Sequence, residues 1–395
     1  MIVKLLLVIA FFCSMVAVGI YSRKHATDVS GFVLGNRSVG PWLTAFAYGT
    51  SYFSAVVFVG YAGQFGWKYG LASTWIGLGN AVIGSLLAWV ILGRRTRIMS
   101  NHLQAATMPE FFGKRYNSKA LKIVSSAIIF IFLVPYTASI YNGLSRLFAI
   151  AFDIPYSWCV VLMAVLTGAY VILGGYMATA INDFIQGIIM LAGIVAVIWA
   201  VLSGQGGFTE AVRQLAQLPS DVPVTLGQPG AFTSFFGPDP LNLLGVVILT
   251  SLGTWGLPQM VHKFYTIKSE KAVSTGTIIS TLFAVVIAGG SYFLGGFGRL
   301  FDNPAIYNQQ GAVVYDSIIP FMLSSLPDIL IGVVVVLVLS ASMSTLSSLV
   351  LTSSSTLTLD FLKDNIIKNM NEKTQLLLMR ILVVFFILVS VVIAL

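Results

Sequence analysis

Hydroxyl side chains crowd one segment of the chain, Leu339 to Asp360, with the sequence LSASMSTLSSLVLTSSSTLTLD. Twelve of its 22 residues are Ser or Thr, yet the segment begins where the apolar run IGVVVVLVL ends. Offsets of three and four put one set of small residues on a single helix face: Ala341, Ser344, Thr345, Ser348, Thr352 and Ser355. A hard cation that has lost its water needs several oxygen ligands, and hydroxyls on adjacent turns can provide them. The pattern therefore predicts a cation site in an apolar environment.

Helix packing is a simpler interpretation of the same segment. Small residues let helices approach closely, and Ser and Thr can hydrogen-bond back to their own backbone. This interpretation fits best at the end of the run, Ser353 to Thr358. For the run as a whole, the sequence leaves both interpretations open.

A second polar interruption lies in the first quarter of the chain. There AYGTSYFSA stands at the centre of an apolar segment and is followed by Gly60, Gly63 and Gly66. An unpaired backbone polar group is costly in lipid, so such a break survives only where it is buried in protein or lines a wet cavity. Breaks of this kind are typical of transport sites. Carbonyl groups freed between Gly49 and Ser54 are therefore the predicted partners of the hydroxyl face.

Membrane helices are the elements that must position these groups. The chain is 57% hydrophobic and 9% charged over 395 residues, whereas soluble domains have roughly 25% charged residues. An apolar segment of about 18 residues or more crosses the ~30 Å hydrocarbon core. Ten such segments are predicted: 3–22, 39–67, 74–93, 121–149, 156–175, 183–203, 240–261, 273–296, 327–358 and 376–395. The chain is therefore predicted to be an all-α polytopic membrane protein.

The positive charge, +8 in total, determines the predicted topology. With ten spans, 17 of the 22 Lys and Arg residues fall on one side, mainly in loops 23–38, 93–120, 176–182, 262–272 and 359–375. By the positive-inside rule these loops are cytoplasmic and the N-terminus is outside. The basic balance thus reports topology and implies no nucleic acid partner. The first apolar segment is long for a signal peptide and has no clear cleavage site, so we interpret it as a retained helix.

Apart from Asp328 at the start of span 327–358, Asp183 is the only carboxylate inside the predicted spans. A charge at such depth costs about 2.5–3.5 kcal/mol or more, which makes it a functional residue by default. The alternative is a carboxylate at a helix start, stabilised by the helix dipole. An intramembrane hydrolase would need a histidine beside a buried serine, but His25, His102 and His262 all fall in predicted cytoplasmic loops. An enzyme is therefore not expected.

Four stretches of the sequence resemble the sodium:solute symporter family, which includes sodium/proline, sodium/pantothenate, sodium/sialic acid and sodium/glucose transporters. GFVLGNRSVGPW resembles the entry into the family's first core helix, LGGYMATAINDFIQG its fifth, GLPQMVHKFYTIKS the end of its sixth, and SASMSTLSS its eighth. The resemblance covers nearly the whole chain and keeps this order. It implies a LeuT-type core of five plus five inverted helices, preceded by one extra N-terminal helix.

The resemblance also implies an ion site for Na+, the coupling ion. By position, the family's sodium-binding groups correspond to the carbonyls of Thr50, Phe53 and Ala341 and the hydroxyls of Ser344 and Thr345. The matching aspartate of the family, here Asp183, lies on the sodium release path.

The implied solute pocket lies between the broken first helix, the third and the sixth. Its predicted residues are Val57, Tyr136, Ser251, Thr254 and Trp255. Tyr136 resembles an aromatic residue of the proline symporters, although an aromatic at helical spacing is as often a packing residue. The sequence has Thr250 and Thr254 where proline symporters carry aromatic residues, and Val56 and Val57 where sugar transporters have polar ones. These departures argue against both proline and sugars as the solute.

We therefore expect sodium-coupled symport of a small organic solute, of amino-acid, carboxylate or vitamin-like type, by alternating access across the plasma (inner) membrane. The alternatives are a proton-coupled or uncoupled transporter or channel of the same fold, or a transporter-like membrane sensor. The expected partners are the solute, the sodium ion and the lipid bilayer; the oligomeric state is not predicted.

The whole chain, 1–395, is interpreted as a single transmembrane transporter domain. Its expected parts are an extra helix and cytoplasmic loop (1–38), a first inverted repeat (39–203), an extracellular loop (204–239) and an incomplete second repeat (240–395). The sequence ends within or at the end of the ninth core helix, so we expect the C-terminal core helix and the family's trailing helices to be missing from this chain.

Overall fold

The computed structural model describes residues 2–152, 155–324, 326–363, 366–367 and 370–395, with the backbone alone at 2–3 and 142–152. Two cations counted in the predicted topology, the side chain of Arg146 and residue Lys368, lie outside the described part. Within the described residues the chain is helical, and its extended pairings are the isolated bridges of Val39 with Ile267 and of Tyr307 with Val313.

The helices of the body and their direct continuations are α1 (Ile2–Ser22), α3 (Pro41–Tyr52), η3 (Val56–Tyr61), α4 (Ala62–Tyr69), α5 (Thr74–Gly79), η5 (Asn80–Leu87), η6 (Trp89–Gly93), α8 (Lys119–Phe152), α9 (Tyr156–Gly204), α11 (Pro240–Leu252), η9 (Gly253–Gly256), α12 (Pro258–Thr266), α13 (Glu270–Ala284), η10 (Val285–Gly289), α14 (Gly290–Gly295), α16 (Asp328–Thr356), η13 (Leu357–Leu362) and α18 (Glu372–Ala394). Shorter helices near the two ends of the molecule are α2 (Val29–Leu34), η2 (Gly35–Arg37), α6 (Arg94–His102), α7 (Met108–Arg115), α10 (Phe208–Gln217) and α15 (Tyr315–Ser324).

Seven described helical stretches are long and apolar enough to cross a membrane, and the bent pair Pro240–Gly256 and Pro258–Thr266 makes an eighth if it is one span. Two of the seven, Val56–His102 and Tyr156–Gly204, have 47 and 49 residues. At 1.5 Å per residue each is about twice as long as the hydrocarbon core is thick. Each covers parts of two predicted spans, so all ten predicted ranges fall on helix. The protein is a multi-pass membrane protein.

The predicted loop 176–182 is helical, because α9 continues through it after one irregular residue. Gly175 has φ 53° and ψ −144°, a combination that is readily accessible only to glycine. A Cβ atom there would lie 2.7 Å from the carbonyl oxygen of Phe32. A single glycine therefore separates the two predicted spans without a loop. The count of apolar residues predicted a loop at this place.

Two helices are broken within the membrane region. Helix α3 ends at Phe53, whose φ of −106° and ψ of 93° are extended, and the chain becomes helical again just before η3. Helices α11 and α12 meet at an angle of 53° across Leu257, where Pro258 begins the new helix. Proline fits the first turn of a helix but cannot continue one, since it lacks the N–H group.

The halves of the chain share a sequence of helix types. Each begins with a broken helix, α3–η3 or α11–α12, and continues with a helix that contains π-helical turns, in η5 and η6 or in η10. A long helix follows in each half, α8 with 34 residues and α16 with 29. π-Helical turns are rare and often mark functional positions.

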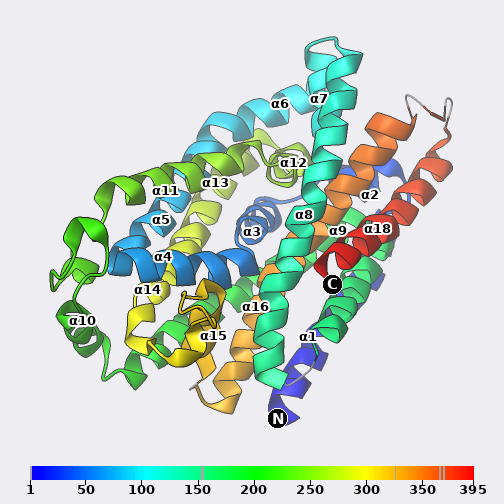
Figure 1. Cartoon of the computed structure of the whole chain (residues 1–395). Helices are drawn as coiled ribbons and strands as arrows, with labels where there is room; N and C mark the ends of the chain where they lie inside the picture. Colours follow the sequence, from blue (N-terminus) through cyan, green and yellow to red (C-terminus); the bar gives the residue numbers. More distant parts are fainter. Residues whose placement is uncertain (1, 153–154, 325, 364–365, 368–369) are drawn as a thin grey trace.

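Helix α16 passes through the middle of the bundle (Figure 1). It packs against α9, α8, α1, α18 and α3, and every residue from Val334 to Thr356 is buried. The hydroxyl-rich segment is therefore surrounded by protein along its whole length and has no lipid-facing side.

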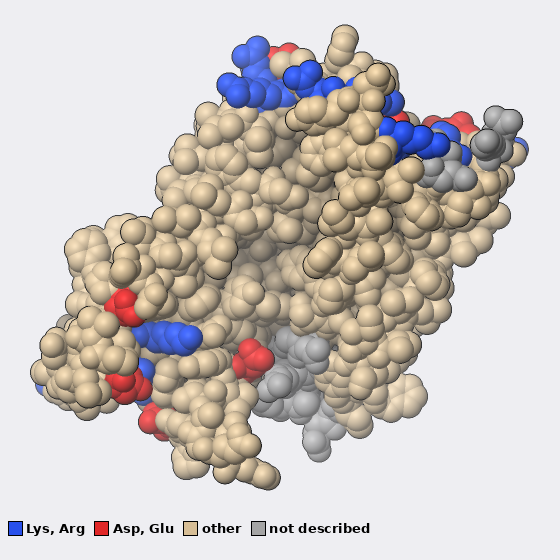
Figure 2. All heavy atoms as spheres, turned by 45° about the horizontal axis from the view of Figure 1, so that its top comes forward, with Lys and Arg blue, Asp and Glu red and all other residues tan. Residues whose placement is uncertain are grey.

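Charge is distributed unevenly between the two ends of the molecule. The N-terminus, α10 and α15 lie at one end, and α6 and α7 lie at the other (Figure 1). Figure 2 shows Lys and Arg gathered at the end that carries α6 and α7, whereas the opposite end displays both signs. We call the first of these the basic end.

Candidate functional site

Four oxygen atoms of the predicted ion site converge where α16 crosses the end of α3. The hydroxyl of Ser344 donates to the carbonyl of Thr50 at 3.3 Å and to that of Ala341 at 3.2 Å. The hydroxyl of Thr345 makes the same two contacts at 3.4 Å and 3.0 Å. All four residues are fully buried. We call these atoms the oxygen cluster.

The break after α3 explains why the carbonyl of Thr50 is accessible to another helix. An α-helix leaves its last carbonyls without partners in the helix, and here hydroxyls of α16 approach one of them. Phe53, the fifth predicted ligand, is the residue at which α3 ends, and its amide donates to the carbonyl of Gly49 at 3.2 Å. No described contact joins Phe53 to the oxygen cluster.

Neutral oxygen atoms from carbonyl and hydroxyl groups suit a hard monovalent cation such as sodium. The described residues bring together no group of three or more His, Cys, Asp or Glu side chains with a metal-binding arrangement. The donor set therefore fits a transported alkali ion, with the hydroxyl protons turned away to free the oxygen lone pairs.

Several other hydroxyls of the run behave as the packing interpretation proposed. Ser340, Ser342, Ser355 and Thr358 each donate to the carbonyl four residues earlier, at 2.7–2.8 Å. Such bonds satisfy a buried hydroxyl within its own helix. Ser344 and Thr345 differ from these hydroxyls because they also contact a second helix, at the carbonyl of Thr50.

A second polar network adjoins the oxygen cluster. Ser348, one turn after Ser344, lies 2.9 Å from the hydroxyl of Ser51 and accepts a hydrogen bond of 2.9 Å from the Lys263 ammonium. The Lys263 Nζ lies 3.6 Å from Oδ2 of Asp183. Asp183, expected on the ion's release path, is thus fully buried against a cation.

The structure corrects the predicted loop 262–272 at its first residues. His262 and Lys263 belong to α12 and are both buried. The His262 ring packs against the rings of Tyr176 and Tyr265, at centroid distances of 5.3 Å and 6.0 Å, and no described serine is bonded to it. The apolar count ended this span at residue 261 because His262 and Lys263 are polar in sequence, although both are buried in the fold.

A cavity of about 440 Å³ lies beside the break in α3, between η3, η5, α8 and α11. Of the predicted solute residues, Val57, Tyr136 and Thr254 line it, together with Thr250 and Val56. Ser251 and Trp255 are not part of its lining. The remaining lining residues are Tyr52, Ser54, Tyr61, Phe65, Asn80, Val246, Leu249, Gly253, Leu257 and Tyr292.

Ser251 of α11 and Trp255 of η9 instead form hydrogen bonds with η5. Oδ1 of Asn80 accepts hydrogen bonds from the hydroxyls of Thr250 and Ser251, both at 3.0 Å. The indole of Trp255 donates to the carbonyl of Ile83 at 2.9 Å. Asn80 was missed by the sequence analysis, although a buried amide within the predicted span 74–93 is a signal of the same kind as Asp183.

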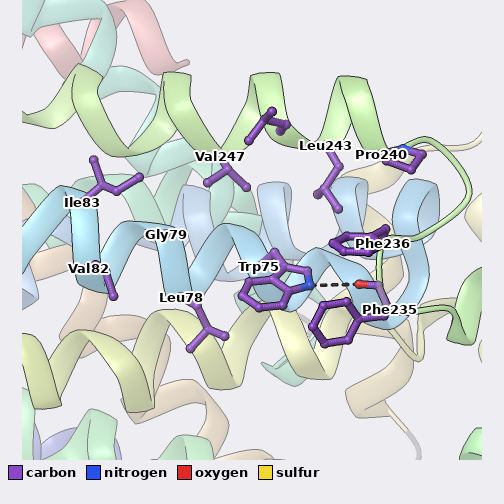
Figure 3. Close-up of a pocket in the computed structure, with 11 residues that line it drawn as sticks. Trp75, Leu78, Gly79, Val82, Ile83, Phe235, Phe236, Pro240, Leu243 and Val247 are labelled. Atoms are coloured by element: carbon purple, nitrogen blue, oxygen red, sulfur yellow. Dashed lines mark hydrogen bonds between the residues drawn. The ribbon is translucent and has the colours of Figure 1, made fainter.

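An apolar groove lies on the other side of this junction (Figure 3). It has a volume of about 440 Å³ and is lined by α5, η5, α11 and residues Phe235 and Phe236. The Trp75 indole donates to the carbonyl of Phe235 at 2.9 Å and fixes the loop at one end of the groove. Leu243 and Val247 of α11 face the groove, whereas Val246 and Thr250 of the same helix line the cavity beside the break in α3. We call that cavity the solute cavity, after the pocket that the sequence predicts there.

Comparison with known proteins agrees with this geometry. The family model of the "Sodium:solute symporter family" matches residues 32–395. The sodium/proline symporters of Staphylococcus aureus strains JH9 and JH1 are each 29% identical to this chain over 373 residues, which cover 91% of this chain and 68% of theirs.

A solved structure supports the fold independently of sequence. It is described as the substrate-bound outward-open state of a Na+-coupled sialic acid symporter, and it matches 99% of this chain and 81% of its own with a TM-score of 0.82 at 15% identity. The predicted all-helical, LeuT-type fold is thereby confirmed, and these relatives are transporters and not enzymes. Since the family model also covers nearly the whole chain, the protein belongs to the sodium:solute symporter family, whose coupling ion is Na+.

Proposed function

We propose that this protein takes up a small, uncharged or zwitterionic organic solute across the plasma membrane together with sodium, by alternating access, with its N-terminus outside. The proposal rests on one observation: the oxygen cluster and the solute cavity both lie at the break after α3. The carbonyl of Thr50 belongs to the oxygen cluster, while Val56 and Val57 line the solute cavity. An ion bound before the break therefore orients the residues that meet the solute after it.

The chemistry of the cavity supports the solute class. Its described lining combines aromatic and aliphatic side chains with hydroxyls and the amide of Asn80, and it contains no Lys, Arg, Asp or Glu. Such a lining suits a ligand with an apolar body and a few hydrogen-bonding groups. Among the expected classes, an amino-acid-like zwitterion fits better than a multiply charged carboxylate.

The parts of the chain have corresponding roles in this proposal. Residues 39–203 and 240–395 are the two inverted repeats, because each begins with a broken helix that contributes to the sites. Residues 1–38 add a helix outside the repeats, and 204–239 form the external connection. The basic end then faces the cytoplasm by the positive-inside rule.

Solute binding measured in two salts tests the proposal. Purified protein in nanodiscs is titrated with a panel of labelled amino acids, beginning with L-proline because the S. aureus relatives are named for it. We expect at least one panel member to bind at least tenfold more tightly in sodium than in equimolar potassium, since coupling requires that sodium favour the solute-competent state. Equal affinity in the two salts for every ligand that binds would support an uncoupled transporter instead.

Collapse of the proton gradient tests the proton-coupled alternative. Sodium-driven uptake into vesicles should persist when the proton gradient is collapsed with an ionophore. Loss of uptake under that condition, with sodium still present, would favour proton coupling through Asp183.

A further inference from the structure

Lys263 is a charged residue held deep inside the protein. Its side chain is 2% exposed, and the carboxylate of Asp183, 3.6 Å away, is fully buried. The ammonium also donates to Ser348 at 2.9 Å and lies 5.2 Å from the centre of the Tyr176 ring. A buried ammonium needs a counter-ion and hydrogen-bond acceptors to remain charged. These partners hold the Lys263 ammonium at a defined position.

That position is about one helical turn from the oxygen cluster. Ser348, which accepts the bond from Lys263, follows Ser344 by four residues on α16, a rise of about 6 Å. Ser348 also contacts Ser51, which follows Thr50 on α3. Both helices that supply the oxygen cluster are thus linked to the ammonium through one serine.

Lys263 lies on the side of the oxygen cluster that faces the basic end. Helix α12 ends at Thr266, and the next carbonyl, that of Ile267, accepts a hydrogen bond of 2.5 Å from Arg97 of α6. The amide of Val39, just before α3, donates to the carbonyl of Thr266 at 3.2 Å. Lys263 therefore lies between the oxygen cluster and the basic end.

The helix that carries Lys263 is also connected to the solute cavity. Helix α11 contributes Val246 and Thr250 to that cavity, and it continues through the bend at Leu257 into α12. Lys263 is in the second turn of α12. Movement of α11 on solute binding would shift the ammonium relative to Asp183 and Ser348.

We infer that Lys263 is a positioning residue that acts as an electrostatic gate on the inner side of the sodium site. Its ammonium repels a sodium ion that moves inward from the oxygen cluster, and solute binding withdraws it through α11 and α12. Sodium therefore leaves inward only when solute accompanies it. Asp183 holds the ammonium in place and is already paired with it, so in this state it is not a free ligand for the ion. The inference rests on the proposed sodium-coupled symport.

Sodium entry without solute is the measurement that isolates the gate. Wild-type protein and the K263M variant are reconstituted into vesicles at equal density, and entry of radioactive sodium is followed with no organic solute present. We expect K263M to admit sodium at least tenfold faster than wild type, because methionine keeps an unbranched side chain, one atom shorter than that of lysine, and removes its charge. Vesicles with K263R, which keeps a positive charge, should admit sodium no faster than wild-type vesicles.

Two further variants keep the inference falsifiable. K268M removes an exposed lysine five residues later and should not change sodium entry. K263M/D183N removes both charges, so it leaves no unpaired buried carboxylate to destabilise the fold, and it should leak as K263M does. The inference would be overturned if K263M/D183N vesicles admitted sodium as slowly as wild-type vesicles while the variant still showed a normal sodium-induced change in tryptophan fluorescence. Equal leaks for K263R and K263M would overturn it too, since side-chain shape and not charge would then matter.

The outcome does not depend on the identity of the solute. Solute binding in sodium and in potassium is measured on the same wild-type preparation and reports separately on the proposed function. If K263M vesicles admit sodium no faster than wild-type vesicles while wild type binds solute in a sodium-dependent way, the gate is contradicted and the proposed function is not.

Discussion

At the scale of single residues, the oxygen cluster distinguishes hydroxyls that look alike in the sequence. Ser342 and Ser344 are both buried on α16, but Ser342 donates only within its own helix, to Val338 at 2.8 Å. Ser344 also reaches the carbonyl of Thr50 on another helix. The difference depends on which face of α16 meets the broken end of α3.

Removing both hydroxyls of the oxygen cluster should weaken sodium binding. The S344A/T345A variant is expected to raise the sodium concentration for half-maximal uptake at least tenfold, which corresponds to about 1.4 kcal/mol of lost ion binding. Uptake is measured in vesicles over a range of sodium concentrations with the solute identified by the binding panel.

The matched control for this prediction is S340A/S342A. These two hydroxyls are equally buried on the same helix but donate to Val336 and Val338 of α16 itself. The control should keep the sodium dependence of wild type. The ligand assignment would be wrong if the two double variants showed the same shift.

The sequence could predict the oxygen cluster because helical spacing already placed Ser344 and Thr345 on one face, and the family resemblance pointed to Thr50 and Ala341. It could not predict Lys263 as part of the site, because a lysine beside polar residues at the end of a span has the pattern of a loop. Only the packing of α12 against α9 and α16 shows that this lysine is buried. Side-chain direction was equally hard to predict: Ser251 and Trp255 bond to η5 and are not part of the lining of the cavity.

At the scale of elements, the junction between η5 and α11 separates the solute cavity from the apolar groove. Asn80 is the centre of that junction, since its amide oxygen accepts from two residues of α11. The residue is 2% exposed and lies at the wall of the solute cavity, so shortening its side chain removes the acceptor of two hydroxyls beside that cavity. Element positions were largely predictable from apolar length, whereas this junction depends on side chains that meet only after packing.

Shortening Asn80 should therefore weaken solute binding. N80A leaves the buried hydroxyl of Ser251 without its acceptor, which costs about 1–3 kcal/mol. We expect the dissociation constant of the solute to rise roughly tenfold, the equivalent of 1.4 kcal/mol, when binding is titrated in nanodiscs. N101A, at an exposed position on α6, serves as the control, and an unchanged solute affinity in N80A would contradict the role given to the junction.

The bend in α9 gives a prediction about stability. G175A forces a Cβ into a backbone conformation that disfavours L-residues by about 1–3 kcal/mol, and it brings that atom close to the carbonyl of Phe32. Thermal unfolding in detergent should begin several degrees lower than for wild type. G204A, where an added Cβ meets nothing within 4 Å, should unfold as wild type does; equal unfolding temperatures for both variants would show that the bend tolerates a side chain.

At the scale of the whole molecule, the charge asymmetry predicts how the protein is oriented in the membrane. Lys and Arg gather at the basic end (Figure 2), and loops rich in these residues are retained on the cytoplasmic side. The N-terminus lies at the opposite end (Figure 1). The sequence predicted this distribution well because it depends on counts of charges and not on packing.

Cysteine labelling checks the orientation. In a background without Cys13 and Cys159, a cysteine at the exposed Asn101 should react with an impermeant maleimide only from the cytoplasmic side, and one at the exposed Gln228 only from outside. The neighbouring Ser100 and Ser220 are buried and would label poorly. The reverse labelling pattern would invert the topology.

Transport should also move net charge. One sodium ion that crosses with a neutral or zwitterionic solute gains about 2.3 kcal/mol per 100 mV of membrane potential, enough for roughly 50-fold solute accumulation at 1.36 kcal/mol per decade. Vesicles with an imposed potassium diffusion potential, negative inside, should accumulate solute faster than vesicles without one. Uptake that does not respond to the potential would indicate electroneutral exchange.

The oxygen cluster has a consequence for how the protein can change over generations. Two of its four atoms are carbonyl oxygens, those of Thr50 and Ala341, and every amino acid carries the same carbonyl. No amino-acid substitution at Thr50 or Ala341 removes the carbonyl oxygen. A substitution can move these two oxygen atoms only by changing the path of the backbone. Half of the oxygen atoms in the cluster therefore depend on the path of the backbone and not on residue type. Single substitutions at Ser344 or Thr345 should produce graded changes in cation preference. A genetic screen for complete loss of ion binding should instead recover residues that fix the end of α3, such as Gly49, where an added Cβ would collide with Phe283.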